Sequence, residues 1–434
     1  MQFKQYPSYK PSGVEWLGDV PEHWDSCNLK FISKIYAGGT PDRNRLDYWV
    51  KGEIPWINSG AVNQVIIKEP SEYITELGLK NSSAKYIPVN SLVMALAGQG
   101  KTKGMVAYTS IETTCNQSMA AIVPKNYHYK FLYYWLDSNY QNIRNLTGGD
   151  NRDGLNLAVL SNIPCPKISI VEQTQIVSFL NTETTRIDNL IAKQEKLIEL
   201  LEEQRKSIIS HAVTKGLNPN APMKDSGVEW LGDVPESWEV IPSKFYFTER
   251  KEKAVNGDKQ LTASQKHGII YQDEFIAENG RVMVVMKNPE ILKKVRPNDF
   301  VISMRSFQGG LELSSLEGSI SSAYVMLKPD LSLINTEYFK YLFKTPRYIQ
   351  SLQSTSNLIR DGQALRFNNF SQVKLVLPPK SEQQEIVEYL DKEKNKIDNL
   401  IYKQKTLIEK LKEYRASIIS HAVTGKIDVR EFGA

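Results

Sequence analysis

This 434-residue chain contains the same eleven-residue segment, SGVEWLGDVPE, twice. A tryptophan follows shortly after each copy, as Trp24 and as Trp238. Two shorter segments, IDNLI and SIISHAVT, also occur once in each half. The paired segments are 12–22 with 226–236, 187–191 with 397–401, and 207–214 with 417–424. Because the matches recur in the same order, the chain is a duplication, and its fold must use one plan twice.

The blocks between the repeated segments share little sequence. Residues 25–171 and 239–381 keep only isolated echoes, such as Arg-Asp-Gly at 152–154 and 360–362. A constant frame with diverged blocks indicates a symmetric scaffold that carries two different specificities. Neutral drift is the alternative, but drift would have blurred the frame as well.

One long helix is expected at the end of each half, over residues 172–213 in the first and 382–423 in the second. Apolar residues recur there in alternating steps of three and four, which is typical of a coiled coil. Glutamine occupies the same position in each helix, and a buried polar residue at such a position fixes register. The predicted seam consists of Ile187, Leu190, Gln194, Leu197, Leu201, Ile397, Leu400, Gln404, Leu407 and Leu411.

The two helices can pair antiparallel. More than forty residues at 1.5 Å per residue would make a rod of about 60 Å. The globular domains would then lie at its two ends, related by an internal pseudo-twofold axis. The predicted seam would also serve partner docking.

The diverged blocks alternate short β-like runs with short helices. Runs at 91–96, 119–123 and 299–304 indicate strands, and 129–138 and 336–343 indicate helices. We therefore predict an α+β fold with two mixed α/β domains separated by two long antiparallel helices. The expected boundaries are 1–171 for the first domain, 172–215 for the first helix, 216–381 for the second domain, and 382–434 for the second helix and tail.

Loops that follow predicted strands carry residues suited to reading DNA. The segment 97–104 combines glycines, an amide and two lysines, and 304–310 occupies the matching place. Arginine and lysine bind guanine edges or phosphates, and glutamine pairs with adenine. For any single residue, a solvated hairpin tip is an equally good interpretation. The candidate DNA contacts are Gln99, Lys101, Lys103, Asn116, Gln117, Asn151, Arg152, Arg305, Ser306, Gln308, Ser321 and Arg360.

Motifs for catalysis by this chain are weak. The segment 95–102 lacks the first glycine of a phosphate-binding P-loop, and the second half has no equivalent. The histidines His211 and His421 recur at helix ends without an acid or cysteine cluster. Neither a methyltransferase motif nor a metal-ligand spacing is present. We therefore expect a non-catalytic chain without a metal or cofactor of its own.

Net charge and cysteine usage limit the cellular setting. The formal charge is +5, which permits a polyanionic partner without requiring one. Three scattered cysteines do not make a disulfide framework. No signal peptide or apolar run long enough to span a bilayer is evident. The expectation is a cytoplasmic protein.

The repeated segments resemble the specificity subunit of type I restriction–modification systems. The resemblance rests on SGVEWLGDVPE at the start of each half and on the helical segments after each variable block. Those segments read EQTQIVSFLNTETTRIDNLI at 172–191 and EQQEIVEYLDKEKNKIDNLI at 382–401, each followed by SIISHAVT. The variable blocks look like target recognition domains, and the resemblance covers the whole chain.

The resemblance implies a division of labour. Each recognition domain would read one half of a bipartite DNA target, and the helices would set the spacing and dock two methyltransferase subunits. Two restriction subunits would complete the nuclease. S-adenosylmethionine, ATP and magnesium would act in those partners. Readers on one face of DNA favour half-sites about one helical turn, ~34 Å, apart.

Three alternatives remain open at this point. The chain could be the recognition part of a related type IIB or IIG system, in which reading and catalysis are fused. It could be a P-loop NTPase that uses Lys101 and Thr102. It could also be a coiled-coil adaptor that binds proteins only.

Overall fold

The computed structural model describes residues 3–98, 101–147, 154–264, 267–279, 291–303, 310–355 and 365–432. Its contacts divide the chain into two compact units, one of residues 1–194 with 406–434 and one of residues 195–405. The unit boundary runs through both long helices. The helices are therefore shared between the units, whereas we expected them to be separate segments, and the C-terminal tail belongs to the first unit.

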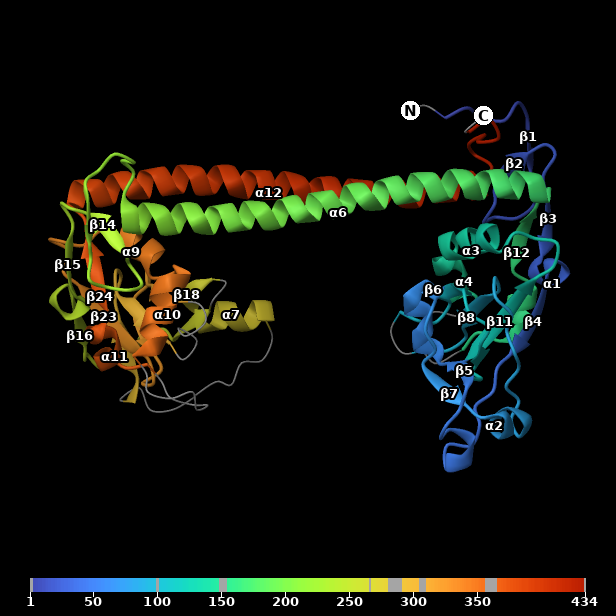
Figure 1. The fold of residues 1–434 in the computed structure, drawn as a ribbon, viewed down its shortest axis with the longest axis horizontal. Coiled ribbons are helices and arrows are strands. Elements are labelled where there is room, and N and C mark those ends of the chain that lie inside the picture. Colours follow the sequence, from blue (N-terminus) through green and yellow to red (C-terminus); the bar gives the residue numbers. More distant parts are fainter. Residues whose placement is uncertain are drawn as a thin grey trace. The chain divides into compact units, whose positions relative to one another are not determined.

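The two expected long helices are present (Figure 1). They are α6, Ile170–Lys215, and α12, Lys380–Val423, so the predicted limits were right to within two residues. Ser169 caps α6, because its hydroxyl accepts a hydrogen bond from the Glu172 amide at 3.2 Å. Gly216 and Gly425 follow the two helices with φ of 74° and 72°, a conformation that suits glycine after a helix end.

The repeated eleven-residue segment forms the same small hairpin in each unit. The hairpins are β1 (Tyr9–Pro11) with β2 (Asp19–Pro21), and β13 (Met223–Asp225) with β14 (Asp233–Pro235). Each hairpin leads to a fully buried tryptophan. The Trp24 indole donates to Glu172 at 3.1 Å, and the Trp238 indole donates to Glu382 at 2.9 Å. The repeated segment thus fastens a buried indole to the first turn of each long helix.

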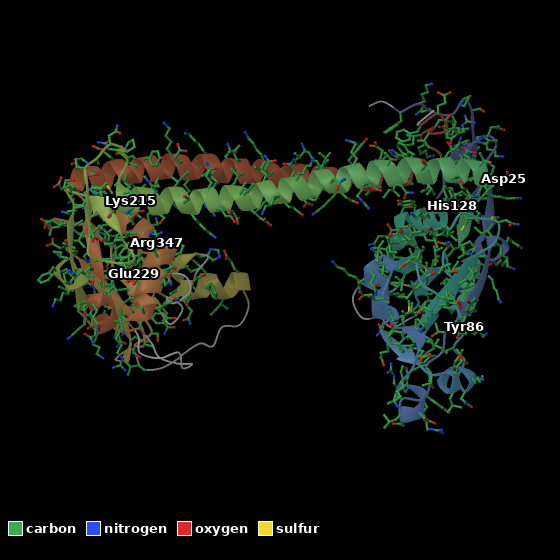
Figure 2. All side chains as sticks on the ribbon, in the orientation of Figure 1. Asp25, Tyr86, His128, Lys215, Glu229 and Arg347 are labelled. Atoms are coloured by element: carbon green, nitrogen blue, oxygen red, sulfur yellow. The ribbon has the colours of Figure 1, made fainter. Side chains whose placement is uncertain are left out.

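The end of a long helix also meets a hairpin in each unit. Lys215, labelled at the end of α6 in Figure 2, donates to the carbonyl oxygen of Leu231 at 3.1 Å and to that of Asp233. In the other unit, Lys426 donates to the carbonyl oxygen of Asp19 at 2.6 Å. The frame is therefore built from the same contacts twice.

The first globular domain is built on a five-stranded sheet in the order β4-β11-β8-β9-β6. All neighbours are antiparallel except β6 and β9. Helix α3, Tyr129–Ser138, has the predicted limits and covers the sheet, and the Tyr134 hydroxyl donates to Asn181 of α6 at 3.3 Å. The sheet strands are β4 Ser33–Ala37, β6 Ile66–Ile67, β8 Leu92–Ala95, β9 Val106–Thr109 and β11 Met119–Pro124.

Smaller elements complete this domain. Strands β10-β5-β7 form a three-stranded sheet, and β3 pairs with β12. Their limits, with those of the short helices, are β3 Asp25–Asn28, α1 Leu29–Ile32, η1 Leu46–Tyr48, β5 Ile54–Ile57, η2 Ser59–Gln64, β7 Glu72–Ile74, α2 Glu76–Lys80, β10 Thr114–Cys115, α4 Tyr140–Asn145, α5 Leu157–Ser161 and β12 Pro164–Lys167.

The second globular domain repeats the strand order on a different sequence. Its main sheet runs β16-β23-β20-β21, all antiparallel, and β15 pairs with β24. Within the described residues, β20 confirms the strand expected at 299–304, and α9, Thr336–Leu342, confirms the helix expected at 336–343. The sheet and edge strands are β15 Glu239–Pro242, β16 Phe247–Arg250, β20 Phe300–Ile302, β21 Glu312–Leu313, β23 Val325–Pro329 and β24 Lys374–Leu377.

The remaining elements of this domain are two β-pairs and short helices. The pairs are β17 with β18 and β19 with β22. The limits are η3 Ser243–Phe245, β17 Leu261–Ser264, β18 Gly268–Tyr271, α7 Gln272–Asn279, β19 Lys293–Val295, β22 Gly318–Ile320, α9 Thr336–Leu342, α10 Pro346–Ser354 and α11 Phe367–Gln372. Both domains therefore have the α+β architecture that the sequence predicted.

The predicted coiled-coil seam was wrong at three positions, where the next residue along the helix faces inward instead. Ile187, Leu201 and Ile397 are buried as expected, and four predicted positions are half-buried, namely Leu190, Gln194, Gln404 and Leu411. However, the predicted seam residues Leu197, Leu400 and Leu407 are exposed by 39%, 43% and 41%. The isoleucine that follows each of them, Ile198, Ile401 and Ile408, takes the inward position.

Ion pairs between the helices form in this phase. Arg415 donates to Asp188 at 2.8 Å in the first unit, and Arg205 donates to Asp398 at 2.5 Å in the second. Both pairs have the same antiparallel register. Steps of three and four fit the leucines and the isoleucines that follow them equally well. The sequence of one helix therefore could not decide which of the two residues faces the partner helix.

Candidate nucleic-acid interface

Strand register brings three candidate stretches of the first domain to one end of its sheet. Ala95 of β8 pairs with Met119 of β11, so the loop after Ala95 lies beside the segment that precedes Met119. The Leu96 amide donates to the Ser118 carbonyl at 2.8 Å, and the Leu155 amide donates to the Leu96 carbonyl at 2.8 Å. Three stretches far apart in the sequence therefore meet at this end.

The second domain repeats this arrangement. Ile302 of β20 pairs with Val325 of β23, so the loop 303–311 begins beside the segment that holds Ser321. Each of the two loops joins neighbouring antiparallel strands, β8 with β9 and β20 with β21. The strands that flank the two loops therefore occupy matching places, and residues 99–100 and 304–309 of the loops lie outside the described residues.

A glycine in the left-handed conformation closes each loop. The φ angles are +85° at Gly104 and +76° at Gly310. A side chain at Gly310 would place its Cβ 2.1 Å from the Phe343 carbonyl oxygen, and one at Gly104 would lie 3.5 Å from the Arg144 backbone. The Phe343 carbonyl therefore leaves no room for a side chain at Gly310, whereas the surroundings of Gly104 are at ordinary contact distance and its positive φ is what favours glycine.

The two lysines of the first loop lie in different surroundings. Lys101 is exposed, and its carbonyl oxygen accepts a hydrogen bond from the Tyr140 hydroxyl. Lys103 is only 3% exposed, and its carbonyl oxygen accepts from Arg144 at 3.3 Å. As placed, Lys101 can reach a phosphate or base edge, whereas the Lys103 side chain is turned into the domain.

Asn116 and Gln117 lie at the same end of the sheet. Gln117 is exposed and accepts a hydrogen bond from the Thr40 hydroxyl, which comes from the segment after β4. The Asn116 side-chain oxygen is buried and has no hydrogen-bond partner among the described residues. An unpaired amide oxygen is costly to bury, so this loop has unused hydrogen-bonding capacity.

Ser321 lines a hollow in the second domain whose wall is partly polar and partly apolar. Its hydroxyl accepts from the Ala323 amide at 3.3 Å. The hollow has a volume of about 210 Å³, and polar side chains from several strands line it. They are Gln260, Thr262, Gln272, Ser319, Ser321, Ser322 and Tyr324. This end of the second sheet thus combines concavity with hydrogen-bonding groups.

Several candidates lie outside the described residues and stay predictions. They are Gln99, Asn151, Arg152, Arg305, Ser306, Gln308 and Arg360.

The sequence did not indicate two residues at this surface. Arg144 lies on α4 and donates to the Tyr140 hydroxyl at 3.2 Å as well as to the first loop. Thr40, in the segment after β4, donates a hydrogen bond to the Gln117 side chain. Both belong to segments without a glycine-rich or repeated pattern, so only the strand register places them here. A cation near the end of a short helix was the one available signal for Arg144.

Arg250 of the second domain has a structural role. Arg250 donates to both oxygens of the buried Asp299 carboxylate, at 2.6 and 2.9 Å. Within the described ranges, no group of three His, Cys, Asp or Glu side chains is placed to hold a metal ion. In the same ranges, no helix has the length and apolar character needed to cross a membrane.

Comparison with known proteins gives a consistent family. The model of the type I restriction modification DNA specificity domain matches residues 21–202. The chain is 31% identical over 206 residues to the EcoR124I/EcoR124II specificity subunit of Escherichia coli, which is 46% of this chain and 48% of that protein. It is also 22% identical to the putative MjaX specificity subunit of Methanocaldococcus jannaschii, over 99% of both chains. It thus spans about half of the first relative and nearly all of the second.

Solved structures agree on the fold. A chain from a structure of type I restriction–modification complex assembly has a TM-score of 0.68 at 17% identity, covering 93% of this chain and 98% of that one. The HsdS subunit of Thermoanaerobacter tengcongensis has a TM-score of 0.56 at 17% identity, covering 94% and 98%. With the duplicated frame and the matching sheets, these likenesses show that the chain has the fold of a type I restriction–modification specificity subunit, and its residues 21–202 match the DNA specificity domain of that family.

Proposed function

We propose that this chain is the non-catalytic subunit that reads a bipartite DNA sequence for a type I restriction–modification complex. Each globular domain reads one half of the target through the sheet end described above. The observation that carries the proposal is the strand register. In both domains it gathers a hairpin loop and a second polar segment at the same end of the sheet.

Divergence of the loops supports two different half-sites. The frame contacts of Trp24 and Trp238 are alike in the two units, and so is the strand order. The loop residues differ, because Lys101 lies in the first loop and Arg305 in the second. Base identity is read by side chains at groove edges, so different loops on one scaffold would select different bases.

The long helices are proposed to dock two methyltransferase subunits and to set the half-site spacing. The leucines excluded from the seam support this role. Leu400 and Leu407 are exposed on α12, and Leu197 is exposed on α6. Tyr402 adds an aromatic ring that is 69% exposed. Apolar rows on a helix surface are typical of sites that bury against another helix.

The catalytic steps are assigned to the partner subunits. S-adenosylmethionine would bind in the methyltransferase subunits, and ATP and magnesium in two restriction subunits. The modest net charge of +5 fits a reader whose partners supply part of the phosphate contacts.

The proposal is tested by DNA selection. The purified chain with its methyltransferase would be mixed with random duplexes, and the bound fraction would be sequenced at a stated salt concentration. The expected result is a motif with two defined halves and an undefined spacer. Selection without any such preference would overturn the proposal.

A further inference from the structure

One short motif recurs at the same point of both globular domains although most of their sequence diverged. Lys30-Phe31 follows the first strand of the first domain, and Lys244-Phe245 follows the first strand of the second. Both phenylalanines are exposed, Phe31 by 70% and Phe245 by 63%. In each motif the lysine ammonium lies near the ring, 5.3 and 5.5 Å from its centre.

The same backbone bonds hold the two turns. The Leu29 amide donates to the Ile163 carbonyl at 2.9 Å, and the Ser243 amide donates to the Val373 carbonyl at 3.0 Å. On the other side, the carbonyl of Ile32 accepts from the Lys125 amide at 2.7 Å, and that of Tyr246 accepts from the Asp330 amide at 2.9 Å. Each ring is therefore presented by an ordered turn of the backbone.

Exposure of one phenylalanine needs no functional explanation, because isolated apolar side chains are common on protein surfaces. Recurrence of an exposed phenylalanine at the same point of two domains does need an explanation. Among two domains that share little sequence, the same cation and the same ring remain exposed at the same point of the fold. A shared structural need would have buried the ring, as it buried Trp24 and Trp238.

Each Lys-Phe turn lies at the sheet end opposite the candidate DNA loops. In the first domain, Ser33 pairs with Pro124, whereas the DNA loop begins after Ala95, which pairs with Met119 at the other end of β11. In the second domain, Phe247 pairs with Pro329 at the far end of β23 from the other loop. A domain that reads DNA with its loops would thus turn the phenylalanine away from the duplex.

The surface around the second turn is suited to a protein side chain. Phe245, Pro329 and Leu331 line a hollow of about 380 Å³ with the exposed Lys328. Tyr246 also lines it, and within the described residues its buried hydroxyl has no hydrogen-bond partner. The exposed Lys125 gives the first turn a second cation beside Lys30.

We infer that Phe31 and Phe245 are equivalent anchors for two copies of the methyltransferase subunit, one on each globular domain. The partner surface would be an apolar socket rimmed by carboxylates, which complements a phenyl ring beside lysines. A partner present in two copies explains why the motif is kept in both domains. The inference rests on the proposed function and adds a contact outside the long helices.

The test uses the full chain with the purified methyltransferase subunit. Phe31→Ala, Phe245→Ala and the double variant would be compared with wild type by native mass spectrometry and by titration. Leu46→Ala is the matched control, since Leu46 is 72% exposed in the first domain and belongs to no repeated motif. Melting temperatures should not change for any variant.

Each single variant should bind one methyltransferase copy about ten-fold more weakly or worse, and the double variant should lose both copies at concentrations where wild type and Leu46→Ala keep them. Lys30→Glu with Lys244→Glu should weaken assembly in the same direction. Normal assembly by the double phenylalanine variant would overturn the inference. So would a defect confined to DNA affinity or to joining of the restriction subunit. If wild type itself neither assembles nor selects a bipartite motif, the proposed function has failed instead.

Discussion

At the residue scale, one buried carboxylate ties the frame of the first unit together. Glu172 accepts from the Tyr6 hydroxyl at 2.8 Å and from the Trp24 indole at 3.1 Å, and its second oxygen lies 2.9 Å from His23 Nε2. Glu382, its counterpart in the second unit, accepts only from Trp238 among the described residues. The duplicated frame is therefore more strongly bonded in the first unit.

Glu172→Gln should consequently destabilise the chain more than Glu382→Gln. An amide nitrogen would face groups that donate, and an unmatched buried polar group costs about 1–3 kcal/mol. Urea unfolding of the full chain at neutral pH measures the difference. Equal losses for the two variants would show that the extra donors around Glu172 contribute nothing.

The C-terminal tail should respond to acid through Asp428. Hydrogen bonding from the Arg430 side chain holds the pKa of the Asp428 carboxyl below its usual value. A carboxyl with a lowered folded-state pKa stabilises the fold at pH values above its unfolded-state pKa of about 3.9. This stabilisation is lost as the pH falls through the folded-state pKa. The unfolding midpoints of wild type and Asp428→Asn should differ at pH 7 and converge below about pH 4. A difference that stays constant with pH would contradict this role.

At the element scale, adjacent residues of α12 should have separate duties. Ile401 is 7% exposed in the seam, whereas Leu400 is 43% exposed. Ile401→Ala should cost about 2–4 kcal/mol of unfolding free energy. Leu400→Ala should leave stability within about 0.5 kcal/mol and should weaken methyltransferase binding. Thermal unfolding and a binding titration on both variants test this difference. A larger loss of stability for Leu400→Ala than for Ile401→Ala would support the original prediction that Leu400 lies in the seam.

The sequence predicted the long helices well and their contacts less well. Periodicity is local, so Ile170–Lys215 could be located to within two residues. The choice between Leu400 and Ile401 depends on the partner helix, through pairs such as Arg205 with Asp398. The same limit applies to the candidate interface. Loop composition indicated Lys101, but only the strand register could place other segments beside it.

The sequence did not predict which residues of the candidate interface are buried or which distant segments contact its loops. Lys103 had the composition of a DNA contact, yet the domain encloses its side chain. Thr40 and Arg144 carry no local pattern and reach the loops through folding alone. Composition therefore indicated loops at one end of each sheet and did not identify every residue that lies there.

At the scale of the whole molecule, the duplication separates frame from specificity. The hairpins, the buried tryptophans and the helix ion pairs recur in both units, and the loops do not. Each globular domain is joined to the frame through its first and last strands, β3 with β12 and β15 with β24. An exchange between these strands keeps the hairpins, the buried tryptophans and the helix ion pairs, while contacts of the domain with its long helix, such as that of Tyr134 with Asn181, are exchanged with it.

Exchange of one domain is the most direct test of this account. Residues 25–171 would be replaced by the equivalent block of a similar specificity subunit, and the assembled complex would be used to map methylated adenines on genomic DNA. The account predicts that one half of the bipartite motif changes while the other half and the spacer stay the same. A motif that is unchanged, or one that changes in both halves, would contradict it.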